Sequence, residues 1–206
     1  MSNLVLLRRE MVEIGQMLET KGLIVAAEGN MSVRLGGHGF LITPAGRCKG
    51  ELKVQELLEV DSHGKCPVGR PTSEWPLHEA IYGLRPDILA VCHAHPPWAT
   101  AFATAGRDLD GQLLTETAQL LPRVPLAPRS LPGTAEVARS IEPLIKDHDA
   151  ILMANHGVVS VGKSLRGAFE LLQTVERLAQ VTLLSEMAAG SCGLDQGMLR
   201  ELVDRN

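Results

Sequence analysis

Aromatic side chains are scarce in this sequence. Phenylalanine, tryptophan and tyrosine together make up 3% of the 206 residues, and Tyr82 is the only tyrosine. Aliphatic side chains must therefore fill the core, and a hydrophobic content of 45% is enough to build one. The length fits one domain or at most two small ones, and no linker, repeat or low-complexity tract divides the chain. We therefore expect a single globular domain over residues 1–206.

Basic clusters and long apolar runs are missing too. The net charge is −4 and the pI is near 6.0, whereas nucleic-acid binding normally needs a clustered positive face. The N-terminal segment becomes charged after a few apolar residues, too few for a signal peptide, and no later run is long enough to span a bilayer. We expect a cytoplasmic protein that binds neither nucleic acid nor membranes.

Closely spaced cysteine pairs are also missing. The four cysteines, Cys48, Cys66, Cys92 and Cys192, are scattered, and none belongs to a CxxC pair. In a reducing cytosol we expect free thiols. Cys92 directly precedes His93, but neighbouring residues of a strand point to opposite faces, which disfavours Cys92 as a metal ligand.

Helical and strand patterns alternate along the chain. They predict helices over 3–21, 74–85, 96–105, 133–147 and 164–189, and strands over 31–35, 39–43, 87–95, 123–128 and on both sides of 155–157. Ser73 is placed to cap the second helix and Gly190 to end the last, and the tail beyond Gly190 has no clear pattern. Because hairpin and crossover signals occur together, we expect one α/β domain with a mixed or mainly antiparallel central sheet.

Two histidines end the apolar run VCHAHPP. His93 and His95 would project from the same face of a strand, where they are either solvated at the strand end or half of a metal site. A third histidine, His156, lies in the turn NHG. Three histidines with a carboxylate or water form the open zinc site that catalysis uses, and Glu74 at a helix start can supply the carboxylate.

The other histidines have weaker claims. His78 follows Glu74 by one helical turn and is either a buried packing residue or a hydrogen-bond partner of a metal ligand, with packing favoured. His38 and His63 lie in turns and His148 lies in a polar segment, so we expect these three to be solvated.

Three short segments offer hydroxyls and backbone amides: EGNMS at 28–32, TPAG at 43–46 and PTSE at 71–74. Each alone is an ordinary turn or cap. Such groups in turns and at helix starts also form anion-binding concavities. Their joint occurrence upstream of a metal site makes phosphate a candidate ligand.

Taken in order, GNMS, TPAG, TSEW with HEAIY, HAHP and NHG resemble the class II aldolase/adducin family over about residues 5–190. The resemblance implies a three-layer α/β/α fold and a homotetramer with sites between subunits. It implies zinc on His93, His95 and His156, with Glu74 as a ligand at rest and as acid/base in turnover. It also implies a substrate phosphate held among Gly29, Asn30, Gly46, Thr72 and Ser73.

The activity that this resemblance implies is cleavage of a ketose 1-phosphate to dihydroxyacetone phosphate and an aldehyde. Two departures bear on the substrate. Ala45 replaces a hydroxyl residue, and the segment at about 112–118, where members cleaving fuculose 1-phosphate carry a catalytic tyrosine, reads GQLLTETAQ. Tyr82 lies elsewhere in the sequence. A more apolar substrate end, as in 5-deoxy or methylthio pentulose phosphates, suits the leucines there.

Other activities in the family remain open. A methylthioribulose-1-phosphate dehydratase would use the same metal triad, and a decarboxylase of a phosphorylated sugar acid is a further alternative. The 4-epimerases carry aspartate after the paired hydroxyl residues, where this chain has Glu74. A non-catalytic adducin-like interaction module would have lost the metal-binding residues, whereas His93, His95, His156 and Glu74 are all present here.

Overall fold

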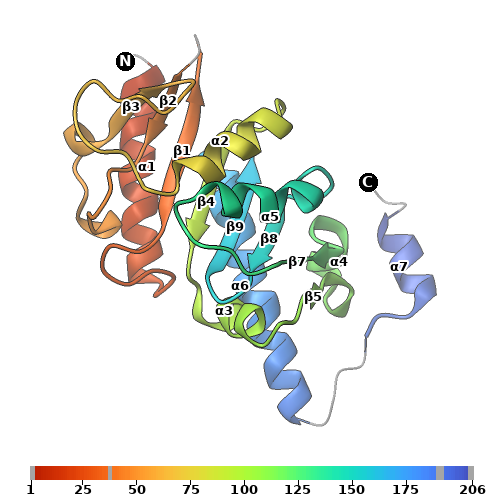
Figure 1. Ribbon diagram of the computed structural model, residues 1–206. Coiled ribbons are helices and arrows are strands. Elements are labelled where there is room, and N and C mark those ends of the chain that lie inside the picture. The colour runs from red at the N-terminus through yellow and green to blue at the C-terminus, as the bar shows by residue number, and fades with distance from the viewer. Residues whose placement is uncertain (1–2, 37–38, 189–192, 204–206) are drawn as a thin grey trace.

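A seven-stranded sheet forms the centre of the protein in the computed structural model, which describes residues 3–36, 39–188 and 193–203 (Figure 1). The strands lie in the order β3 (Leu58–Asp61), β2 (Gly39–Ile42), β1 (Asn30–Leu35), β4 (Ala90–Ala94), β9 (Gly157–Gly162), β8 (Ala150–Met153) and β7 (Leu126–Ala127). Neighbours pair antiparallel except β7 and β8, which are parallel. A smaller sheet pairs β5 (Leu109–Asp110) with β6 (Arg123–Val124).

Helices cover both faces of the large sheet. The longest two, α1 (Asn3–Thr20) and α6 (Leu165–Ala188), pack with α3 (Pro97–Thr104) on one face. The other face carries α2 (Trp75–Leu84) and α5 (Ala135–Ile145). Burial of these aliphatic faces on both sides is the main stabilising term. The predicted three-layer α/β/α fold with a mainly antiparallel sheet is therefore confirmed.

The side chains of β4 alternate between the two cores. Ala90, Cys92 and Ala94 lie in the core formed with α1 and α6, whereas Val91 lies in the core formed with α2 and α5. His93 follows the same alternation and projects from the face that carries Val91. Cys92 thus points away from His93, as expected from the sequence. Within the described residues, Cys48, Cys66 and Cys92 are free thiols, and Cys192 lies outside them.

Two local predictions were wrong. The helix α2 begins at Trp75 with Glu74 at its N-cap position, so exposed Ser73 is not the cap. Residues 123–128 form two dipeptide strands, because Pro125 lacks the N–H that a continuous ladder needs. The tail contains α7 (Gln196–Val203), whereas Gly190, the predicted helix end, lies outside the described residues.

Short elements that the pattern did not predict complete the fold. They are the 3-10 helices η1 (Lys49–Glu51), η2 (Val54–Glu56) and η3 (Gly111–Leu113), and the helix α4 (Thr115–Leu120). Across the described ranges, the helices are all too short or too polar to cross a membrane.

Candidate active site

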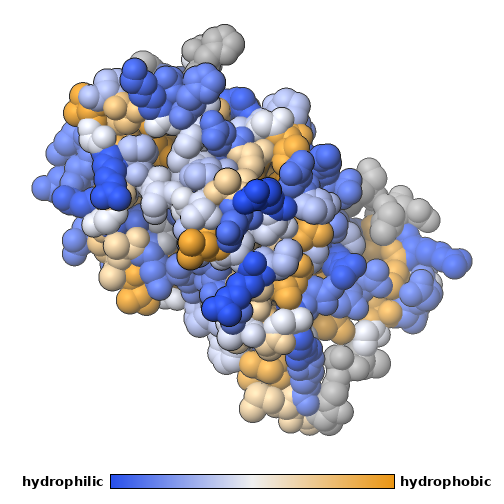
Figure 2. Space-filling model, viewed as in Figure 1, coloured by the Kyte–Doolittle hydropathy of each residue, from blue (hydrophilic) through white to orange (hydrophobic). Residues whose placement is uncertain are grey.

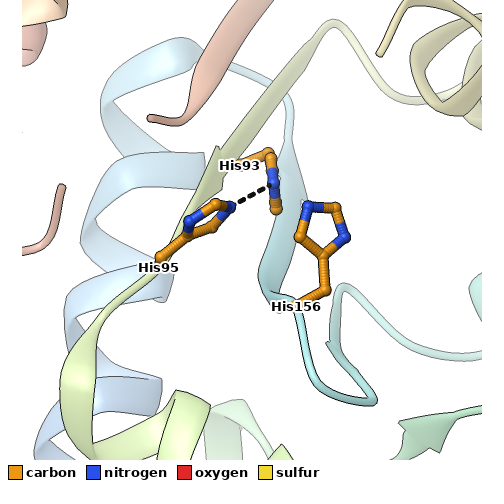
Figure 3. A group of neighbouring side chains, drawn as sticks. All are labelled: His93, His95 and His156. Atoms are coloured by element: carbon orange, nitrogen blue, oxygen red, sulfur yellow. Dashed lines mark hydrogen bonds between the residues drawn. The ribbon is translucent and has the colours of Figure 1, made fainter. Parts of the chain in front are cut away.

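Three histidine rings converge beside the central strands (Figure 3). His93 lies on β4, His95 follows that strand directly, and His156 lies in the turn between β8 and β9. Their ring centroids are 4.7–5.0 Å apart, and one nitrogen of each ring lies within 4.8 Å of the others. We call these three residues the histidine group. The structure thus brings together the three residues that the sequence proposed as metal ligands.

The hydrogen bonds of two rings indicate where their lone pairs lie. His93 Nδ1 is 2.8 Å from the Val158 carbonyl oxygen, which can only accept, so Nδ1 carries the proton. His95 Nδ1 lies 3.3 Å from Glu28 Oε1, which favours a proton there as well. In the neutral rings both Nε2 atoms then carry lone pairs, although they are only 3.1 Å apart. A shared cation stabilises such an arrangement, and an all-imidazole donor set suits zinc.

The local environment keeps two of these rings neutral. Burial lowers the pKa of His93 well below its usual range, and the neighbouring His156 and His95 lower it further. Burial and the proximity of His95 lower the pKa of His156 to about 4. Only neutral imidazole binds a metal, so both rings are ready to act as ligands at neutral pH.

Two glycines give the backbone room around the histidine group. A Cβ on Gly157 would lie 2.5 Å from the Ala94 carbonyl oxygen and 2.7 Å from His95 Cδ2. A Cβ on Gly29 would lie 2.8 Å from the His93 carbonyl oxygen, and Gly29 has φ of +69°. Side chains at either position would therefore displace the strand that carries the histidines.

Glu74 lines the same cavity as the histidine group, although its carboxylate lies outside the compact set of ring nitrogens. Burial raises the pKa of this carboxyl, and a hydrogen bond from the Gly133 N–H partly opposes that shift. Its Oε2 atom is buried and has no hydrogen-bond partner among the described residues. A buried, unpartnered carboxylate oxygen in a cavity is a strong candidate for contact with a ligand or a transferred proton.

The predicted phosphate-binding residues lie around this same cavity, which has a volume of about 190 Å³. They lie at the start of β1, in the turn after β2 and in the segment before α2. We call these residues the loop group: Gly29, Asn30, Gly46, Thr72 and Ser73. Thr72 is buried and Ser73 is exposed. One concavity therefore joins the loop group, Glu74 and the histidine group.

A chain of buried hydrogen bonds orients Asn30 within the loop group. His78 is fully buried, and burial lowers its pKa to about 3, so the ring is neutral. Its Nε2 donates to Asn30 Oδ1 at 2.5 Å, and Ser32 Oγ donates to its Nδ1 at 2.6 Å. The Tyr82 hydroxyl lies 2.8 Å from Ser32 Oγ, behind His78. His78 is thus a core residue that holds Asn30, and its bond leaves the Asn30 amide N–H groups free for the cavity.

Two further lining residues were missed as functional residues by the sequence reasoning. Glu28 was seen only as the start of EGNMS, yet its carboxylate accepts from Val25 N at 2.9 Å and lies beside His95. Lys49 is 2% exposed and lines the cavity as well. A lysine in the polar stretch GRCKG carries no sequence signal for burial.

The segment expected to carry a catalytic tyrosine lies at a different concavity. Leu114, Glu116 and Thr117 line a cavity of about 560 Å³ against α6, with no residue in common with the histidine cavity. Tyr82 is buried against Phe40 with centroids 4.5 Å apart, and it does not line the histidine cavity within the described part of the chain. Neither region places a phenol beside the histidines within one chain.

Comparisons with known proteins agree with this architecture. Residues 9–183 match the family described as Class II Aldolase and Adducin N-terminal domain. A 5-methylthioribulose-1-phosphate/5-deoxyribulose-1-phosphate aldolase of Rhodospirillum rubrum is 33% identical over 175 residues, covering 84% of this chain and 79% of that protein. A 3-oxo-tetronate 4-phosphate decarboxylase of Escherichia coli is 33% identical over 183 residues, covering 86% of each. Among solved structures, an L-fuculose 1-phosphate aldolase superposes with a TM-score of 0.88 at 27% identity, covering 97% of this chain and 95% of that one.

Proposed function

Because the chain belongs to the class II aldolase and adducin family, we propose that it is a zinc-dependent aldolase that cleaves a ketose 1-phosphate between its third and fourth carbons. The products are dihydroxyacetone phosphate and an aldehyde. The observation that carries the proposal is the single cavity lined by the histidine group, buried Glu74 and the loop group. It combines a cation site, a proton-exchanging group and donors for an anion.

The residues divide the chemistry between them. Zinc bound by His93, His95 and His156 would act as a Lewis acid that stabilises negative charge on the substrate oxygens. During cleavage the hydroxyl on the fourth carbon loses a proton, the bond between the third and fourth carbons breaks, and the third carbon gains a proton. Glu74 exchanges a proton with the reacting carbon, because the residue lines the cavity, its buried Oε2 has no hydrogen-bond partner among the described residues, and burial raises the pKa of the carboxyl.

The loop group holds the phosphate in this proposal. The Asn30 amide N–H groups are left available by the bond from His78 to Asn30 Oδ1. Hydroxyls of Thr72 and Ser73 and the backbone at Gly29 and Gly46 add donors around the same space. Binding of the phosphate fixes the neighbouring carbonyl next to the metal and so converts binding energy into orientation.

The substrate class that fits best is a 5-deoxy or methylthio pentulose 1-phosphate. Support comes from a relative at 33% identity that is named for this activity, and from the lack of a tyrosine beside the histidine cavity within the described part of the chain. A second candidate is decarboxylation of a phosphorylated 3-oxo sugar acid. It is favoured by the Escherichia coli relative, which is equally similar and aligns over a slightly longer stretch.

We further propose that residues 1–206 form one domain and that four copies assemble. Large apolar side chains are exposed on three neighbouring helices: Leu120 on α4, Leu184 and Met187 on α6, and Met198 on α7. Figure 2 shows apolar side chains gathered at the lower end of the molecule, over the C-terminal part of α6. Light scattering of the purified protein tests this: a tetramer mass is expected, and a monomer at all concentrations contradicts it.

The experiment that tests the activity uses zinc-loaded protein and a panel of four substrates. They are 5-methylthioribulose 1-phosphate, 5-deoxyribulose 1-phosphate, fuculose 1-phosphate and 3-oxo-tetronate 4-phosphate. Dihydroxyacetone phosphate is followed by coupled NADH oxidation, and carbon dioxide is measured in parallel. We expect dihydroxyacetone phosphate from the first two substrates. Carbon dioxide from the last alone would replace the aldolase proposal with the decarboxylase, and no product from any would contradict both.

A further inference from the structure

Lys49 is a buried lysine at the junction of two segments of the loop group. It begins η1, three residues after Gly46. Its Nζ donates to the Ala27 carbonyl at 2.6 Å and to the Arg47 carbonyl at 2.9 Å. Ala27 lies two residues before Gly29, so the ammonium is held between the segment leading into β1 and the turn that follows β2. Both segments line the histidine cavity.

The charge on Lys49 has no counterion in the described part of the chain. Its two partners are neutral carbonyls, and no carboxylate among the described residues lies within 4.0 Å of Nζ. An ammonium has three N–H groups, so these two bonds leave one donor. A buried charge without a partner is costly and is retained where a ligand provides the opposite charge. Burial also lowers the pKa of Lys49 to about 8.

The other charges around the cavity make this lysine distinctive. Among the described lining residues, Lys49 is the only lysine or arginine, whereas Glu28 and Glu74 are both carboxylates. A phosphate entering the cavity would meet these two carboxylates, and Lys49 is the one lysine or arginine among the described lining residues that can offset their charge. Ala45, on the same turn, also lacks the hydroxyl that the family resemblance leads one to expect at this position. A donor is therefore missing on this turn where Lys49 can supply one.

We propose that Lys49 is a phosphate-recognition residue, whose ammonium pairs with the phosphate of the substrate between the Ala27–Asn30 segment and the turn at Gly46. This inference rests on the proposed function for the identity of the ligand as a phosphate ester. It assigns to Lys49 the role of selecting phosphorylated over unphosphorylated substrates. The reacting carbons remain with Glu74 and the histidine group.

The test measures binding rather than turnover. Inorganic phosphate is titrated into the zinc-loaded protein by calorimetry for wild type, Lys49→Met, Lys49→Arg and Arg47→Met. A lost charge-assisted hydrogen bond predicts about 10- to 100-fold weaker phosphate binding in Lys49→Met. Lys49→Arg keeps the charge and should recover part of the affinity. Arg47→Met removes an equal charge from an exposed side chain that pairs with Glu56, outside the cavity lining, and should bind within about twofold of wild type.

Metal content and thermal unfolding identify a merely structural role. If Lys49 only braces the two segments, Lys49→Met lowers zinc stoichiometry or the unfolding temperature, and phosphate binding weakens to the same extent in Lys49→Arg. Wild-type phosphate affinity in Lys49→Met, or an equal loss in Arg47→Met, would overturn the proposal. Because phosphate titration requires no substrate turnover, an inactive substrate panel would contradict the proposed function and leave this test intact.

Discussion

The histidine group and the loop group line one cavity but are built by different means. The histidine group stands on or beside two central strands, with His93 1% exposed and hydrogen-bonded to the adjacent strand β9. The loop group comes from three separate segments, and its members Gly46 and Ser73 are exposed. Backbone pairing fixes the strand that carries His93, whereas in the loop group Asn30 alone lies on a strand, and its side chain is held by the bond from His78. Substitutions in the histidine group should therefore abolish activity, whereas those in the loop group should reduce it only in part.

The largest effect is expected for His95→Ala. Loss of one of three imidazoles should remove bound zinc, and the lost charge stabilisation of several kcal/mol lowers activity by about 10³-fold or more. Metal analysis and turnover are measured on the same samples. The exposed His63, outside the cavity, provides the control His63→Ala, which should keep both. Stoichiometric zinc in a His93→Ala, His95→Ala double variant would remove the histidine group from the proposal.

The next effect is expected for Glu74→Gln, which separates chemistry from metal binding. The amide keeps the shape of the side chain but cannot exchange the proton, so kcat should fall by about 10² to 10⁴ while zinc content remains near wild type. The matched control is Glu79→Gln, an exposed position on the same helix. A less stable but fully active Glu74→Gln variant would show that Glu74 is structural.

A smaller effect is expected for Glu28→Gln, which tests how the histidine group is oriented. The amide oxygen can still accept from Val25 N, but the negative charge beside His95 Nδ1 is lost. Partners of this kind contribute about 10- to 100-fold to metal affinity. Competition with a chelator should show weaker zinc binding at unchanged thermal stability, with exposed Glu51→Gln as the control. Unchanged zinc affinity would mean that Glu28 only closes its own turn.

The smallest effect is expected for Ser73→Ala in the loop group. The side chain is exposed, so one hydrogen bond to phosphate should contribute about 1 kcal/mol, or roughly fivefold in KM. The change should raise KM for the phosphorylated ketose and leave kcat nearly constant. Ser62→Ala, exposed in the turn after β3, serves as the control. A loss confined to kcat would move Ser73 from binding to chemistry.

The sequence predicted the parts of the site that follow from strand periodicity. The spacing of His93 and His95 placed both on one face of a strand, and NHG placed His156 in a turn, because side-chain alternation is a local property. The motif series also predicted the fold and the residues that share the cavity. Ser73 as a helix cap was wrong because the helix begins beyond Glu74, and helix boundaries depend on packing at the end of the first turn.

The remaining features depend on contacts between distant residues. The buried ammonium of Lys49 donates hydrogen bonds to the Arg47 carbonyl two residues away and to the Ala27 carbonyl 22 residues away, and no local pattern encodes the second contact. The bond between His78 and Asn30 spans 48 residues. The segment at 112–118 corresponds by resemblance to one that carries a catalytic tyrosine in enzymes cleaving fuculose 1-phosphate, and only the three-dimensional structure shows that Leu114, Glu116 and Thr117 line a separate cavity against α6.

The pairing of β1 with β4 has a consequence for substrate length. Asn30 faces His93 directly across the two strands, and cross-strand partners in an antiparallel pair lie about 4.5–5.5 Å apart at Cβ. The spacing between Asn30 and His93 is therefore set by a sheet register, which can change only in whole-residue steps that reverse the facing side chains. Proteins with this fold can therefore accept substrates that differ at the end far from the phosphate. The number of bonds between the phosphate and the substrate oxygens next to the metal site stays the same.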